Sequence, residues 1–321
     1  MDRRRLAQIA YLYYKEKLSQ DEIAQCVGLS RSQISRLLAE AENVGVVRIE
    51  IDEVDDRAHD LEEGLKQAFG LEDAMVVYRM GTQDASVRKT IGRAAARYLA
   101  ETLIDGDSIG ITSGHTLREV VRFLRRPEAR DLKVVQLMGG AGATALQTYP
   151  EELARDYAQA LGATLFSLHA PLVVEDKGVR DIIMSTASVT EVTRMWDTLS
   201  VVVMGVGDLS VDALLFKAGW FTPDDLNLLV SAGAVGVICG QFFDLRGKRV
   251  NSPADERIIA APLESFRHAR RSIAVAGGST KAVPLLAAIR GGYCNTVITD
   301  DKTAQEMLAR VESVEARTAT R

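Results

Sequence analysis

The pattern of apolar and polar positions changes along the chain, from helical spacing at the start to alternating strands and helices further on. Near the N-terminus, apolar side chains recur three and four positions apart, which places them on one face of a helix. This spacing predicts a helix over 2–15 and two shorter helices over 19–28 and 30–43. The apolar faces consist of Leu6, Ile9, Ala10, Tyr13, Ile23, Ala24, Val27, Ile34, Leu37, Leu38 and Ala41.

Two capping boxes mark where the second and third helices begin. Ser19 with Glu22, and Ser30 with Gln33, form the S-x-x-E/Q pattern, in which two side chains satisfy backbone donors at a helix start. Gly28 lies between them and can adopt the left-handed conformation that ends a helix. Two short capped helices joined by a glycine turn are typical of a helix-turn-helix, whose second helix enters the major groove of DNA.

The polar face of the third helix carries the chemistry of a recognition helix. Its first turns hold short or forked hydrogen-bond donors, which suit phosphates and base edges. The alternative is an ordinary helical hairpin with a solvated polar face. The paired caps and the basic, amide-bearing helix start favour DNA binding. The residues predicted to contact DNA are Arg31, Ser32, Gln33, Ser35 and Arg36.

Beyond this module the pattern indicates a connection and then a second domain. Val46–Ile51 alternates apolar and polar residues, which predicts a strand. It is either the wing of a winged helix-turn-helix or the first strand of the next domain. A charged helix over 55–69 is expected to link the two domains. The expected domains are 1–52 for DNA binding, 53–70 for the linker and 71–321 for effector binding and oligomerisation.

From residue 73 onward, short continuous apolar runs alternate with amphipathic stretches of helical length. Continuous apolar runs are typical of strands buried on both faces of a parallel sheet. The alternation therefore predicts an α/β fold with a doubly wound, mostly parallel sheet. A hairpin is expected around Arg246 and Gly247. The expected strands are 73–78, 108–111, 133–137, 164–168, 199–204, 234–239, 271–275 and 296–298.

Composition agrees with an ordinary globular protein of two domains: of 321 residues, 47% are hydrophobic and 26% are charged. No apolar stretch is long enough to span a bilayer, and no signal peptide is indicated. The three cysteines form no C-x-x-C pattern, so we expect neither disulfides nor a zinc site, and a cytoplasmic location.

The net charge of −5 is unevenly distributed. Residues 1–39 hold seven basic and four acidic residues, a local charge of +3, which leaves −8 for the remainder. Because one small basic surface neutralises few phosphates, tight DNA binding is expected to require an oligomer.

Four strand ends are rich in glycine and small polar residues, and ligands of such sheets bind at the carboxyl ends of strands. Each loop alone is more readily explained as a tight turn. Four in one sheet, one with a lysine at a helix start, favour a phosphate-bearing small molecule. The candidate effector residues are Ser113, Gly114, His115, Thr116, Gly139, Gly140, Asp208, Asp244, Gly277, Gly278, Ser279 and Lys281.

Three of these candidates carry charge. Lys281 opens a predicted helix, where it can pair with a phosphate. Asp208 and Asp244 can accept hydrogen bonds from sugar hydroxyls, although Asp244 lies in the predicted hairpin and could equally cap its turn. The chain has no P-loop, no dinucleotide-binding fingerprint, no metal-ligand spacing and no clear catalytic constellation. No cofactor, metal ion or catalytic residue is therefore expected.

Taken together, these segments resemble the SorC-type family of bacterial sugar-responsive transcription regulators over nearly the whole chain. The resemblance is carried by LSQDEIAQCVGLSRSQISRLL, VVQLMGG, VVVMGVGDL, GAVGVICGQFFDLRGKRV and VAGGSTKAVPLLAAIRGGYCNTVITDDKTA. It implies an N-terminal helix-turn-helix, an effector domain similar to sugar-phosphate isomerases, and a homo-oligomer, either a dimer or a tetramer formed as a dimer of dimers. It also implies effector contacts from the loop 113–116, Asp244 and Lys281.

One departure from the family pattern concerns Met138. Some deoxyribose-phosphate-responsive members have a lysine at this position and hold the sugar as a Schiff base. Methionine cannot form an imine, so the effector is expected to be held non-covalently.

The expected function is a transcriptional regulator of carbohydrate metabolism whose binding to double-stranded operator DNA is controlled by a phosphorylated sugar or a related effector. One alternative is an isomerase-like enzyme with an appended DNA-binding module. Such an enzyme needs a positioned base, and Asp208 has no obvious partner for that role. Another is a sensor that acts through protein partners.

Overall fold

The chain forms two compact units, Met1–Asp55 and Asp56–Arg321, in the computed structural model. No helix of the described residues is long and apolar enough to cross a membrane. The structure describes residues 3–47, 57–81, 83–140, 149–210, 221–252 and 254–319, with side chains as far as residue 311.

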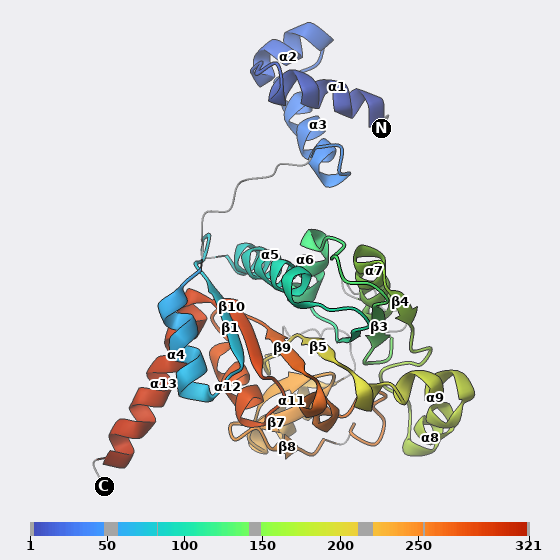
Figure 1. Cartoon of the computed structure of the whole chain (residues 1–321), viewed down its shortest axis with the longest axis vertical. Helices are drawn as coiled ribbons and strands as arrows, with labels where there is room; N and C mark the ends of the chain where they lie inside the picture. Colours follow the sequence, from blue (N-terminus) through green and yellow to red (C-terminus); the bar gives the residue numbers. More distant parts are fainter. Residues whose placement is uncertain are drawn as a thin grey trace. The chain divides into compact units, whose positions relative to one another are not determined.

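The first unit consists of three helices around a small apolar core (Figure 1, blue). Both predicted capping boxes are formed: the backbone N–H of Ser19 donates to Glu22 at 2.8 Å, and that of Ser30 donates to Gln33 at 2.8 Å. Gly28 has a φ of 66° and ends the second helix. The predicted helix-turn-helix is therefore confirmed. Most of the strand expected over 46–51 lies outside the described residues. The helices are α1 (Arg3–Tyr14), α2 (Gln20–Val27) and α3 (Arg31–Asn43).

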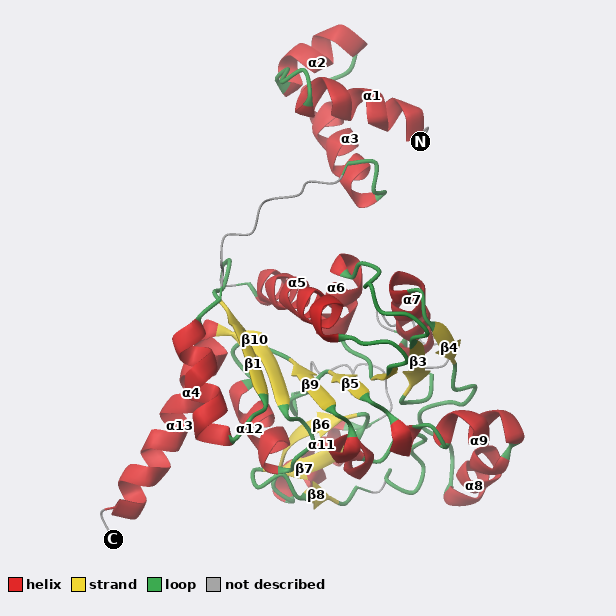
Figure 2. Ribbon diagram, viewed as in Figure 1, coloured by secondary structure: helices red, strands yellow, loops and turns green. Residues whose placement is uncertain are grey.

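The second unit is built on a seven-stranded parallel sheet in the order β1-β10-β9-β5-β2-β3-β4 (Figure 2, yellow). The chain runs outward from β2 through β3 to β4, returns to β5 beside β2, and continues through β9 to β10. Strand order therefore reverses between β2 and β5, which is where doubly wound sheets bind ligands. The strands are β1 (Asp73–Val77), β2 (Ser108–Ile111), β3 (Lys133–Gln136), β4 (Thr164–Phe166), β5 (Val201–Met204), β9 (Arg271–Val275) and β10 (Thr296–Asp300).

Helices cover both faces of this sheet, which confirms the predicted α/β fold (Figure 1). Neighbouring residues of β5 show the two faces: Val203 packs in the core beneath α5, α6 and α7, whereas Val202 and Met204 pack in the core that includes α4, α12 and α13. The helices are α4 (His59–Phe69), α5 (Asp84–Thr102), α6 (His115–Phe123), α7 (Pro150–Leu161), α8 (Lys177–Ser185), α9 (Ala187–Thr193), α11 (Pro223–Ser231), α12 (Ala282–Arg290) and α13 (Asp301–Ala319), with 3₁₀ turns η1 (Trp196–Thr198) and η2 (Leu263–His268).

The strand expected over 234–239 is present, but it does not continue the parallel sheet. It is β6 (Ala234–Ile238), which pairs antiparallel with β7 (Gln241–Asp244), and β7 pairs with β8 (Arg249–Val250). The turn between β6 and β7 is Cys239-Gly240, with φ values of 52° and 75°. A two-residue turn with positive φ closes a hairpin and is too short for a parallel crossover.

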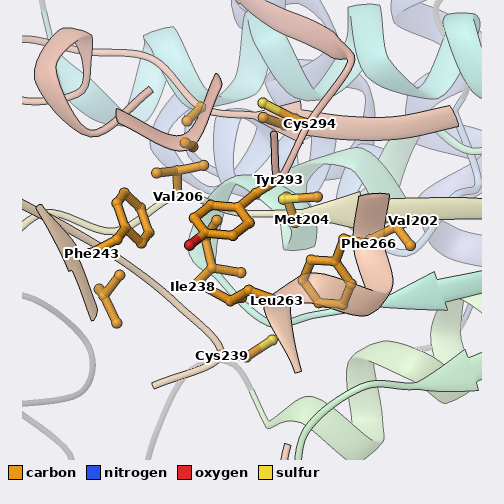
Figure 3. Close-up of a cluster of buried hydrophobic side chains, with 14 of the residues drawn as sticks. Val202, Met204, Val206, Ile238, Cys239, Phe243, Leu263, Phe266, Tyr293 and Cys294 are labelled. Atoms are coloured by element: carbon orange, nitrogen blue, oxygen red, sulfur yellow. The ribbon is translucent and has the colours of Figure 1, made fainter. Parts of the chain in front are cut away.

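The small antiparallel sheet packs on the face of the main sheet opposite α5 to α7. Phe243 and Ile238 from this sheet and Tyr293 meet Met204 of β5 in a buried apolar cluster (Figure 3). This packing holds the turn at Cys239 close to the carboxyl edge of the main sheet, where the candidate site lies.

Helix α4 belongs to the second unit. Its Leu65 is fully buried in the core of that unit. Glu62, 3% exposed, accepts hydrogen bonds from the Arg57 guanidinium at 2.9 and 2.7 Å and from the backbone N–H of Val76 at 2.8 Å. The helix assigned from sequence to the linker is thus fixed to the sheet at β1.

Candidate functional site

A cavity of about 610 Å³ lies at the carboxyl edge of the parallel sheet, where the loops after β2, β5 and β9 meet. This is the place where strand order reverses, so the fold itself brings these loops together. The lining residues are Asp84, Arg88, Ser113, Gly114, His115, Thr116, Met138, Gly205, Val206, Gly207, Asp208, Ser210, Val237, Cys239, Gly240, Val275, Ala276, Gly277, Gly278, Ser279, Thr280 and Lys281.

All the effector residues expected from sequence line this cavity except Gly139, Gly140 and Asp244. The two glycines pack against a neighbouring segment instead: a Cβ on Gly139 would lie 2.3 Å from the carbonyl oxygen of Pro171. Asp244 caps the hairpin turn, because its Oδ1 accepts from the backbone N–H groups of Arg246 and Lys248, both at 2.9 Å. Of the two alternatives for Asp244, the structure therefore supports turn capping.

The charged candidates Asp208 and Lys281 form an ion pair in the cavity wall. Lys281 Nζ lies 2.7 Å from Asp208 Oδ2, which also accepts from the Thr280 hydroxyl at 2.5 Å. Burial alone would raise the pKa of Asp208, but the Lys281 charge and the hydrogen bonds from Lys281 and Thr280 outweigh burial and lower it. Asp208 is thus held ionised, and the charge of Lys281 is balanced within the protein.

Beneath the 277–281 loop, a buried carboxylate fixes the backbone. Asp300 is 1% exposed and accepts from Arg79 Nε at 2.5 Å, from the Thr303 hydroxyl at 2.6 Å and from the backbone N–H of Gly278 at 2.9 Å. A Cβ on Gly277 would lie 2.3 Å from Asp300 Oδ2. Gly277 is therefore required by close approach to Asp300, and Gly278 has a φ of 112°, which residues with a side chain rarely adopt.

Three helices of the second unit begin beside the cavity without a side-chain cap: α5, α6 and α12. Of the other described helices of the second unit, α4, α7 and α9 also begin without a side-chain cap, whereas α8 and α11 have one. A helix N-terminus presents backbone N–H groups and a partial positive charge, which favour anions. The edge of the cavity is suited to a negatively charged group.

Sequence analysis did not single out Asp84, Arg88, Ser210 or Thr280, which also line the cavity. Asp84 and Arg88 lie one turn apart at the start of α5, so from sequence they are indistinguishable from a solvated helix face. The sequence feature that could have indicated them is that α5 follows the carboxyl end of a parallel strand, β1, where ligands of such sheets bind.

Comparisons with known proteins agree with this architecture. A profile of the sugar-binding domain family Sugar-bind matches residues 56–309, and a profile of the MarR family matches residues 1–58. The deoxyribonucleoside regulator of Bacillus subtilis is 31% identical over 299 residues, which cover 93% of this chain and 95% of that protein. The sorbitol operon regulator of Klebsiella pneumoniae is 30% identical over 315 residues, which cover 96% and 98%.

The chain belongs to the SorC-type sugar-binding transcriptional regulators. The crystal structure of full-length SorC from Klebsiella pneumoniae is similar to it with a TM-score of 0.74 and 29% sequence identity, over 96% of this chain and 99% of that chain. The family membership inferred from sequence motifs is confirmed, and with it a carbohydrate-responsive transcriptional regulator that binds DNA through its helix-turn-helix.

On this SorC-type regulator, the predicted DNA-contact residues occupy the exposed face of α3. The opposite face of α3 supplies Ile34, Leu37 and Leu38 to the core of the first unit. Burial of that face leaves the polar side chains available to DNA. The exposed residues are Arg31, Ser32, Gln33, Ser35 and Arg36.

Two of the predicted contact residues have a structural task as well. Gln33 Oε1 accepts from the backbone N–H of Ser30, so the side chain closes the capping box at the start of α3. Arg36 Nε lies 3.4 Å from the carbonyl oxygen of Ser32. The amide group of Gln33 retains its N–H donors for a base edge while its oxygen caps the helix.

Proposed function

We propose that this regulator binds a small phosphorylated sugar, or a related effector with an anionic group, non-covalently in the cavity at the carboxyl edge of the sheet. Binding there controls its affinity for double-stranded operator DNA. The observation that carries the proposal is the convergence of uncapped helix N-termini with the Asp208–Lys281 pair in one cavity. Its volume of about 610 Å³ lies within the range of small-molecule sites.

The polar groups of the lining fit the two halves of such a molecule. Ser113, Thr116 and the start of α6 offer hydroxyls and a helix N-terminus to an anion. The ionised Asp208 is a strong acceptor for sugar hydroxyls. The proposed effector residues are Ser113, Gly114, His115, Thr116, Asp208, Gly277, Gly278, Ser279 and Lys281.

Non-covalent binding is supported by the side chains in the lining. Met138 lines the cavity and cannot form an imine. Lys281 is the only lysine in the described lining, and its ammonium group is held by Asp208 at 2.7 Å. Neither side chain therefore presents a free amine to the carbonyl group of a sugar. Borohydride is expected to trap no sugar adduct on the protein, as measured by intact mass. A mass increase of one reduced sugar would contradict non-covalent binding.

We further propose that the regulator acts as a dimer or a tetramer on an imperfect palindrome, since one first unit neutralises few phosphates. The alternative of an isomerase-like enzyme is disfavoured because Asp208, the carboxylate at the strand end, is ion-paired and has a lowered pKa, which makes it a weak base.

A thermal-shift screen tests the proposal. Pentose and hexose phosphates are compared with the same sugars without phosphate. A ligand at a hundred times its dissociation constant stabilises the folded state by about 2.7 kcal/mol. A phosphorylated sugar that raises the melting temperature should also change the gel shift of the upstream DNA of the chain's own gene. Stabilisation by the neutral sugars alone would reject a phosphorylated effector, and turnover of any sugar phosphate would favour the enzyme.

A further inference from the structure

Arg88 and Lys281 both line the cavity, but their surroundings differ. Lys281 is ion-paired with Asp208 at 2.7 Å and is also part of the cluster with Thr280. Arg88 is partly buried in the same lining, and among the described residues it makes no hydrogen bond or ion pair. Its guanidinium donors are therefore available to a ligand in the cavity, whereas the ammonium group of Lys281 already contacts a carboxylate.

The packing of α5 against α6 places Arg88 beside the start of α6. A Cβ on Gly92 would lie 2.7 Å from Glu119 Cβ and 2.9 Å from the backbone nitrogen of Val120, so the two helices touch there. Each helix follows the carboxyl end of a parallel strand, so α5 and α6 run in the same direction, and Figure 1 shows them side by side. One turn before this contact lie Arg88 on α5 and Thr116 on α6.

We propose that Arg88 is the residue that binds the anionic group of the effector, together with the N-terminus of α6 and the Ser113–Thr116 loop. The Lys281–Asp208 pair then binds the hydroxyl-bearing part of the same molecule. The effector class is a polyol or sugar with a phosphate, or another oxyanion group, at one end. This inference rests on the proposed function and specifies which residues of that site bind which part of the effector.

The chemistry of each subsite fits its assigned half. The planar guanidinium of Arg88 presents paired donors that match two oxygens of a phosphate. The start of α6 adds backbone N–H groups and a partial positive charge. Asp208 would repel an anion placed next to Lys281, whereas it accepts hydrogen bonds from hydroxyl groups well. Asp84 is the other acid of the lining, and it faces Gly278, whose Cβ would lie 3.4 Å from its Oδ1.

Phosphate titrations of matched variants test this assignment. The full-length chain and its Arg88→Gln, Arg88→Lys and Lys281→Gln variants are titrated with inorganic phosphate by calorimetry, at constant ionic strength held with chloride. Arg88→Gln should weaken phosphate binding by at least about tenfold, because a charge-assisted hydrogen bond is lost. Arg88→Lys should recover part of the loss, and Lys281→Gln should change phosphate affinity little. Melting temperatures and circular dichroism confirm that each variant is folded.

A second titration with a phosphorylated sugar from the thermal-shift screen separates the two subsites. Both Arg88→Gln and Lys281→Gln should weaken that ligand, but only Lys281→Gln should weaken the same sugar without its phosphate. Loss of phosphate binding in Lys281→Gln and not in Arg88→Gln would overturn the assignment while leaving the proposed function intact. A wild-type chain that binds neutral sugars and no phosphate compound would overturn both.

Discussion

At the scale of single residues, Asp300 shows how a buried charge shapes the loop that borders the cavity. Burial would raise the pKa of Asp300, but hydrogen bonds from Thr303 and Arg79 outweigh burial and lower it below its ordinary value. A carboxyl whose pKa is lower in the folded state than in the unfolded state stabilises the fold at neutral pH. That contribution is lost as pH falls through the folded-state pKa.

We therefore expect Asp300→Asn to lower the free energy of unfolding at pH 7 by on the order of 3 kcal/mol, since it removes one partner of a buried charge pair. The difference from wild type should shrink as pH falls below about 4, where an ordinary carboxyl becomes protonated. Urea unfolding at several pH values measures this. A difference that is constant with pH would mean that shape, and not charge, holds the loop.

Gln33 is a second residue with a testable double role. We expect Gln33→Ala to weaken operator binding by on the order of 1–3 kcal/mol with little effect on random DNA, because a base-edge contact is lost. Gln33→Glu keeps the acceptor that caps α3 and removes the amide donors. Fluorescence anisotropy with both DNAs, and the melting temperature of each variant, separate the roles. Equal loss on both DNAs would assign Gln33 to phosphate contact or to capping alone.

At the scale of elements, the sequence predicted those parts that local chemistry determines. The capping boxes at Ser19 and Ser30 placed α2 and α3, and apolar runs placed the parallel strands. The sequence did not predict that β6 lies outside the parallel sheet. Its antiparallel pairing depends on the two-residue turn after it, in which Cys239 has a positive φ that is unusual for a cysteine. Arg88 was not singled out from the sequence because its place in the cavity lining depends on how α5 packs in the fold.

Gly92 tests that helix contact. In an open helix, Gly→Ala stabilises by up to about 1 kcal/mol. Here the added methyl would meet the α6 backbone at 2.8 and 2.9 Å, so Gly92→Ala should instead destabilise the protein by roughly 1–3 kcal/mol and shift Arg88. Gly64→Ala in α4 is the matched control, because its Cβ would meet only the flexible end of Leu308 at 3.2 Å. Denaturant unfolding of both variants measures the sign, and a stabilised Gly92→Ala would contradict the close helix contact.

At the scale of the whole molecule, the described contacts lead from the cavity loop to the residues at which the chain enters the second unit. Gly278 is bonded to Asp300, and Asp300 to Arg79, which follows β1. The end of β1 in turn pairs with that entry point: Val77 bridges to Arg57, and the backbone N–H of Ala58 donates to Val76 at 2.7 Å. The cavity loop is thus connected to residue 57 through these hydrogen bonds and through the backbone that joins Val77 to Arg79.

Glu62 stabilises the contact between residue 57 and β1, because its carboxylate accepts hydrogen bonds from both Arg57 and the backbone N–H of Val76. We expect Glu62→Gln to leave effector affinity nearly unchanged and to reduce the change in operator affinity that the effector causes, a coupling of typically 1–3 kcal/mol in such proteins. Glu63→Gln is the matched control: Glu63 is the next residue of α4, is exposed, and forms an ion pair with Lys66 on the surface. Operator titrations with and without effector measure the coupling in each variant. Since the two substitutions are chemically identical, an equal effector response in both would show that the signal does not pass through the contact between α4 and β1.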